Sequence, residues 1–197
     1  MTGAFRGVMA LRHRQTYCTL LVCLLVLAPS GILAKNPTLN HIAVSNTNDD
    51  LILHLSLEGA FSEKIKRNIL SGNPTSFSFI VHLNHVRDLW FDEQIAQIKV
   101  WHTITYDNAK KEFSVRRSWR SNEAEVTSSF EEARQWMTQI ENLKIIPLGR
   151  MDKGSQYQLR TKAEVSKKTL PLNLQQVLFF LSFWDEETDW YIIDFAY

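Results

Sequence analysis

Four histidines are the residues best suited to bind a metal ion. His82 and His85 form an H-x-x-H pair, and His54 and His102 lie in other segments where apolar and polar residues alternate. Imidazoles from neighbouring strands are good ligands for zinc or copper. Residues three apart on a strand point to opposite faces, however, so His82 and His85 cannot act together unless the strand ends between them. We therefore predict ordinary strand and loop histidines, with no metal and no other cofactor.

A second candidate is the acidic stretch Asp185-Glu186-Glu187 with Asp189. Grouped carboxylates can bind calcium or supply the acid and base of a hydrolase. This stretch lacks the glycine-containing loop of a helical calcium site, so a solvated turn between a helix and a strand is the prediction. The sequence also lacks G-x-S-x-G, H-E-x-x-H and a glycine-rich phosphate loop. We predict no catalytic residues and no enzymatic activity.

Basic residues give a candidate interaction surface, made of Lys110, Lys111, Arg116, Arg117 and Arg120. Such a surface would suit anionic lipid headgroups, in a peripheral membrane contact, or an acidic partner. Because Arg116 and Arg117 are neighbours on a predicted strand, they point to opposite faces and form no single patch by themselves. The alternative is a hairpin whose charged edges discourage aggregation.

The N-terminus has the order of a secretory signal peptide. Three arginines precede an apolar run over residues 17–28, and Pro29-Ser30-Gly31 and Ala34 follow it. The run is shorter than the roughly 20 residues of a membrane span, which favours cleavage after Ala34. Ile32 is a weaker choice than alanine at its position, so an uncleaved inner-membrane anchor is the alternative. We predict a signal peptide over residues 1–34 and a periplasmic protein.

The remainder, residues 35–197, has the size and composition of a single domain. Both cysteines, Cys18 and Cys23, precede it, so it contains no disulfide and no thiol nucleophile. Three of the 22 basic residues and none of the 21 acidic residues lie before Lys35, which leaves 19 basic against 21 acidic side chains. This balance gives no electrostatic case for nucleic-acid binding.

The hydrophobic pattern predicts many strands and fewer helices. Alternation predicts strands over 39–45, 51–57, 77–87, 95–106, 112–119, 156–165 and 190–197, with hairpins at 46–50 and 107–110. Helical spacing predicts a short helix containing Ile65 and Ile69, a capped helix over 129–143, and an apolar helix over 172–184. The expected fold class is α+β: an antiparallel β-rich sheet or sandwich with about three packed helices.

Three tryptophans, Trp90, Trp184 and Trp190, are candidates for a pocket, although a core role is favoured for each. A pocket beneath the helix over 172–184 would suit a carrier of small ligands or lipids, or a hydrolase. A different architecture is suggested by Tyr191, Phe195 and the terminal Tyr197, which resemble the last strand of an outer-membrane barrel. The predicted helices and the charged strand faces argue against that barrel.

Several short segments occur in an order that resembles one family. They are Ser71-Gly72-Asn73-Pro74, Trp90-Phe91-Asp92-Glu93, Tyr106-Asp107-Asn108, Ser129-Phe130-Glu131-Glu132-Ala133, Leu170-Pro171 and Trp184 through Trp190-Tyr191. The order is similar to that of an exported family of Gram-negative bacteria, domain of unknown function 4390. The resemblance implies an envelope protein without assigned catalytic residues. Its members are often encoded beside a membrane sensor histidine kinase, which implies a non-catalytic signalling-accessory module whose partner is such a kinase or another envelope protein.

Overall fold

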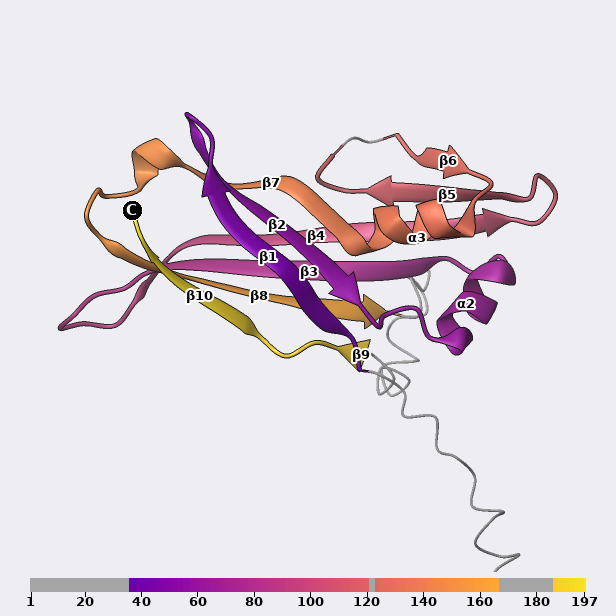
Figure 1. Ribbon diagram of the computed structural model, residues 1–197, viewed down its shortest axis with the longest axis horizontal. Helices are drawn as coiled ribbons and strands as arrows, with labels where there is room; N and C mark the ends of the chain where they lie inside the picture. Colours follow the sequence, from indigo (N-terminus) through magenta and orange to yellow (C-terminus); the bar gives the residue numbers. More distant parts are fainter. Residues whose placement is uncertain (1–35, 121–122, 167–185) are drawn as a thin grey trace, which may run out of the picture. The chain divides into compact units, whose positions relative to one another are not determined.

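Two antiparallel sheets form the fold that the computed structural model describes for residues 36–120, 123–166 and 186–197 (Figure 1). The smaller sheet has the order β1-β2-β7, with β1 at Thr38–Asn46, β2 at Asp50–Glu58 and β7 at Gln139–Pro147. The predicted first hairpin is confirmed, since β1 and β2 pair around a turn that Thr47 closes.

The larger sheet has the order β10-β8-β3-β4-β5-β6, and the short β9 pairs with β8. Its strands are β3 (Thr75–His85), β4 (Glu93–Asp107), β5 (Glu112–Arg117), β6 (Glu125–Thr127), β8 (Gln156–Ser166), β9 (Glu186–Glu187) and β10 (Tyr191–Ala196). The long central pair β3–β4 extends from Thr75↔Ile104 to His85↔Glu93, with one register shift between Leu83 and Asn84. The predicted hairpin of β4 and β5 is confirmed.

One hydrophobic core lies against both sheets. Alternate residues of β3, including Phe77, Phe79 and Leu83, have no exposed surface. The predicted face of β8, from Tyr157 to Val165, is buried as expected, and every second residue of β2 from Leu51 is buried too. A strand period of two therefore places one apolar face of each sheet in the core.

The two α-helices of the described residues begin at side-chain caps. The helix α2 (Glu63–Leu70) has Ser62 as its N-cap and buries Ile65 and Ile69, which confirms that prediction. The helix α3 (Phe130–Thr138) begins where Ser129 Oγ accepts a hydrogen bond from Glu132 N, which confirms one half of the predicted capping box. In place of the other half, Ser129 N donates to Thr127 Oγ1, which in turn donates to the Glu132 carboxylate.

The prediction that this second helix continues to residue 143 is wrong. The helix ends at Thr138, and Gln139–Pro147 forms β7, whose Ile140 pairs with Leu55 of β2. Asn142, at φ 61°, lies at an irregularity of this pairing and lets the strand continue past it. Because Ile140 fits both the helical stripe and a strand face, the local pattern could not distinguish the two, and pairing with β2 decided it.

The expectation of about three helices is not matched, because the described residues contain two α-helices and a 3₁₀ turn at Leu148–Arg150. The third predicted helix, over 172–184, lies outside the described residues, and so does the predicted signal peptide. No helix of the described segments is long and apolar enough to cross a membrane. The last predicted strand is confirmed as β10, which pairs with β8 along its whole length.

Candidate functional site

The turn between β3 and β4 carries the most exposed apolar side chains of the described residues. Leu89, Trp90 and Phe91 are 96%, 74% and 87% exposed, and we call these three residues the apolar tip. The rings of Trp90 and Phe91 meet edge to face, with centroids 6.3 Å apart. In Figure 1 this turn is the loop that projects beyond the left end of β3 and β4. Trp90 therefore lies outside the core, contrary to the interpretation favoured from the sequence.

The base of this turn is closed by polar contacts. The Arg87 guanidinium pairs with the Glu93 carboxylate, and Arg87 N donates a hydrogen bond to Asp92 Oδ1 at 3.4 Å. Val86 N donates to Gln156 O at 2.9 Å, which ties the turn to β8. The apolar tip is thus presented on two paired strands and is anchored where it leaves them.

The structure does not gather the predicted basic surface into one patch. Lys110 and Lys111 lie in the β4–β5 turn, at the opposite end of β4 from the apolar tip (Figure 1). Arg116 is exposed, whereas Arg117 is 7% exposed and pairs with Glu125 of β6. Arg117 cannot belong to an exposed surface, because its strand position faces the core.

Arg120, the fifth residue of that predicted surface, lies 3.8 Å from the same Glu125 carboxylate. In the β4–β5 turn, the Asp107 carboxylate accepts hydrogen bonds from Ala109 N and Lys110 N at 2.8 and 3.1 Å. These hydrogen bonds lower the pKa of Asp107. An acidic side chain therefore shapes the turn that carries the two lysines.

The candidate histidines lie apart and have separate partners. His54 Nδ1 accepts a hydrogen bond from Asn142 N at 3.4 Å, and His85 stacks on Tyr157. His82 contacts Trp190 instead. Within the described part of the chain, no three His, Cys, Asp or Glu side chains are placed to hold a metal ion.

His102 is the most buried of these histidines. Its Nδ1 lies 3.0 Å from Met137 O, and Trp119 Nε1 donates a hydrogen bond to its Nε2 at 2.8 Å. Burial lowers the pKa of His102 to about 4, while the hydrogen bond to Met137 acts in the opposite direction. The imidazole is neutral near neutral pH and joins β4 to the end of α3, which is a structural role.

Trp190 lies against the outer face of the larger sheet. Its ring contacts the His82 ring at 5.1 Å, and the cations of Arg160 and Lys162 lie 5.1 and 5.4 Å from its centroid. Lys162 also pairs with Glu187 of β9. These contacts tie the C-terminal segment to β8 and β3, which explains this tryptophan structurally. Trp184, the third tryptophan candidate, lies outside the described residues.

The acidic stretch is also partly described. Glu186 and Glu187 form β9 and pair with Val165 and Glu164, so this part is a short strand and not the predicted turn. Asp185 lies outside the described residues.

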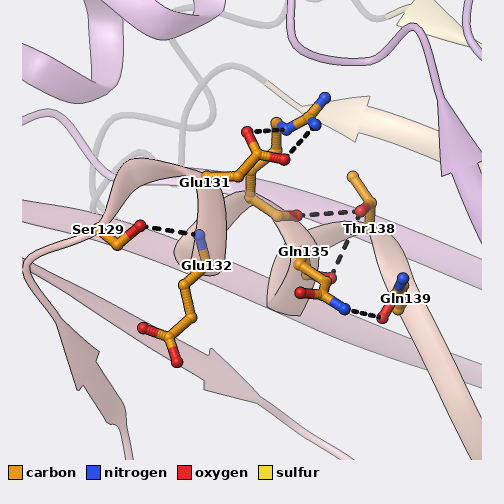
Figure 2. Close-up of polar contacts among 7 residues, drawn as sticks. Ser129, Glu131, Glu132, Gln135, Thr138 and Gln139 are labelled. Atoms are coloured by element: carbon orange, nitrogen blue, oxygen red, sulfur yellow. Dashed lines mark hydrogen bonds and ion pairs between the residues drawn. The ribbon is translucent and has the colours of Figure 1, made fainter.

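A groove of about 500 Å³ runs between α3 and the end of β2. Its helical wall is polar, and Figure 2 shows how these side chains contact one another. Glu131 Oε2 accepts from Arg134 Nε at 3.0 Å, and Gln135 Nε2 donates to Gln139 Oε1 at 3.1 Å. A second groove of about 240 Å³ shares His41 and Ser56 with the first. Because the polar groups largely satisfy each other, this wall resembles an ordinary solvated helix face.

The family described as Domain of unknown function (DUF4390) has a sequence model that matches residues 34–194. The chain belongs to this family. The resemblance inferred from the ordered segments is therefore confirmed. A search of curated proteins finds no match to the chain, and a search of solved structures finds none either.

In this DUF4390 protein, Trp90-Phe91-Asp92-Glu93 is one of the ordered family segments, and the sequence favoured a core role for Trp90. The signal for an exposed tip was present, since Leu89-Trp90-Phe91 stands between Arg87-Asp88 and Asp92-Glu93. The charged pairs on both sides interrupt the alternating pattern of a strand. The three apolar residues between them therefore belong to a turn and not to a strand that would be buried on one face. The apolar tip is the described feature that packing does not explain, so it is the candidate functional site.

Proposed function

We propose that this DUF4390 protein is exported to the periplasm and acts there as a non-catalytic interaction module, as an accessory to a membrane sensor histidine kinase. The apolar tip is the observation that carries the proposal. Three adjacent large apolar side chains are more than 70% exposed, on a turn held by two long paired strands.

The size of the apolar tip supports a binding role. Exposure of this degree in one leucine and two aromatic residues corresponds to on the order of 500 Å² of apolar surface. That is within the range of the largest apolar patch on a typical monomer, which is often functional. Tryptophan is also enriched among the residues that dominate binding energies. Keeping such a surface in water is unfavourable, and a partner that covers it removes that cost.

The N-terminal sequence supports the location. A basic region, an apolar run and a small residue precede Lys35, and both cysteines lie within that part. A carrier or hydrolase needs a roomy apolar pocket with a few convergent polar groups. The two grooves do not fit that description, since the walls of the larger one are mostly polar and the smaller one, of about 240 Å³, is below the usual size of a ligand pocket. The pocket expected beneath residues 172–184 lies outside the described residues and stays a prediction.

In-cell photo-crosslinking tests the proposal. A photoreactive phenylalanine analogue replaces Phe91 in the apolar tip or, as a matched control, Ala109 in the exposed turn at the other end of β4. We expect protein adducts from position 91 and few from position 109, with the kinase identified by mass spectrometry. Adducts from position 109 alone would favour the lysine surface predicted from the sequence. Absence of protein adducts at position 91 would refute the proposed function.

A further inference from the structure

The charges around the apolar tip indicate which kind of surface receives it. We infer that the apolar tip inserts into an apolar pocket of a partner protein whose rim carries lysine or arginine side chains. This inference rests on the proposed function and adds the chemistry of the partner's site.

The net charge beside the apolar tip is negative. Four charged residues flank it: Arg87, Asp88, Asp92 and Glu93. The Arg87 guanidinium is paired with Glu93, so its charge is neutralised. The carboxylate of Asp92 is held by the backbone N–H of Arg87, and Asp88 makes no ion pair with any residue the structure describes. Two carboxylates therefore border the apolar surface without a neutralising cation.

The negative charge of these two carboxylates makes some partner surfaces more favourable than others for covering the apolar tip. An anionic bilayer would bring its headgroups against both carboxylates, and each like charge near such a surface weakens binding. A second copy docked by the same turn across a two-fold axis would oppose two identical acidic rims. A partner with a basic rim instead gains attraction and faster association.

The β4–β5 turn of a second copy of this chain carries lysines, but it has no apolar pocket that could receive the apolar tip. Residues 107–111 are all exposed, and Lys110 and Lys111 flank no apolar side chain there larger than Ala109. Charge alone would leave the rings of Trp90 and Phe91 in water. The complementary site therefore requires an apolar pocket as well as cations, on a different protein.

The area of the apolar tip limits the strength of the contact. A standard interface buries about 800 Å² on each partner, and the apolar tip supplies on the order of 500 Å². The apolar tip alone is thus suited to a transient contact, or to the central anchor of a wider one. Charges at the rim of an interface act chiefly on the rate of association, so a change of rim charge has a measurable effect on a transient contact.

Crosslinking through position 91 is repeated in two charge variants. Asp88→Lys reverses a rim charge, and Asp49→Lys makes the same change in the exposed β1–β2 turn as the matched control. Both positions are exposed, so thermal unfolding should be unaffected in either variant. We expect Asp88→Lys to lower the adduct yield about fivefold and Asp49→Lys to leave it unchanged. The partner peptide that carries the adduct should combine apolar residues with lysine or arginine.

The outcomes separate the two proposals. An unchanged or higher yield in Asp88→Lys, with protein adducts still formed, would overturn the basic rim and leave the interaction module standing. Adducts with lipid or with a second copy of this chain would overturn the inferred partner chemistry in the same way. Loss of all protein adducts from the unmodified chain would overturn the proposed function, and this inference with it.

Discussion

The buried His102 should make the folded state sensitive to mild acid. Its side chain has no exposed surface, and it contacts the Phe79 ring at 4.9 Å. Both of its ring nitrogens are engaged, by Met137 O and by Trp119 Nε1. Protonation would place a charge in this apolar environment, near the cation of Arg117, and would turn Nε2 from an acceptor into a donor facing another donor.

The direction of the effect follows from proton binding. The pKa of His102 is about 4 in the folded chain against the ordinary value of 6.5. Between these values the unfolded chain binds a proton that the folded chain does not, so stability falls as the pH falls from 6.5 towards 4. The full difference corresponds to about 3 kcal/mol, and about 2 kcal/mol of it is lost between pH 7 and about pH 4.5.

Urea unfolding of the wild type and of His102→Gln at these two pH values measures this contribution. Glutamine does not titrate and can keep one of the two hydrogen bonds, so the variant lacks this source of acid sensitivity. Carboxylates with lowered pKa, such as Glu164, destabilise both proteins in acid and cancel in the comparison. We expect the wild type to lose about 2 kcal/mol more than the variant.

Equal losses in the two proteins would refute this reasoning. An NMR titration of the wild-type imidazole provides a second measurement that does not depend on the variant's folding. A midpoint for His102 near 6.5 would show that burial does not suppress its protonation.

Three further predictions concern stability, each measured by urea unfolding. Gly72→Ala should lower the free energy of unfolding by about 1 kcal/mol, because Gly72 has φ +80° and a Cβ there would lie 3.3 Å from Asn108 Nδ2. Gly149→Ala is the control and should be near neutral, because a Cβ at Gly149 would have no atom within 4 Å. Ser129→Ala removes the cap of α3 and should cost about 1 kcal/mol; an unchanged stability would contradict the capping role. Glu125→Ala leaves the buried Arg117 without its carboxylate and should cost about 2 kcal/mol, less than a fully buried pair since Glu125 is one-third exposed. A cost of only about 0.5 kcal/mol would mean that this pair acts like a surface salt bridge.

Much of the fold could be predicted from local patterns. Alternation located β2, β3, β4 and β8, because a strand with one buried face must place apolar residues at every second position. Side-chain caps located the beginnings of helices, as Ser129 and Glu132 did for α3. The sequence likewise predicted that Arg116 and Arg117 point to opposite faces, and the structure confirms it.

The candidate site could be predicted only in part. The sequence grouped five basic residues as one candidate surface, yet Arg117 faces the core and the two lysines lie in a separate turn. Trp90 was expected in the core because large aromatic residues usually are buried there. It is exposed because the β3–β4 pairing ends at His85↔Glu93, so the apolar tip extends past the last strand pair, and little of its surface is covered by the part of the chain that the structure describes.

The sequence by itself determined the period of each strand, the residues at which the helices begin, the family, and the near balance of basic and acidic residues. Tertiary structure decided which face of each strand is buried, where α3 gives way to β7, and which apolar residues stay in water. The physical reason is that period and capping depend on neighbours within a few residues. Burial depends on pairing between distant segments, such as β7 with β2, whose free energy exceeds local propensity.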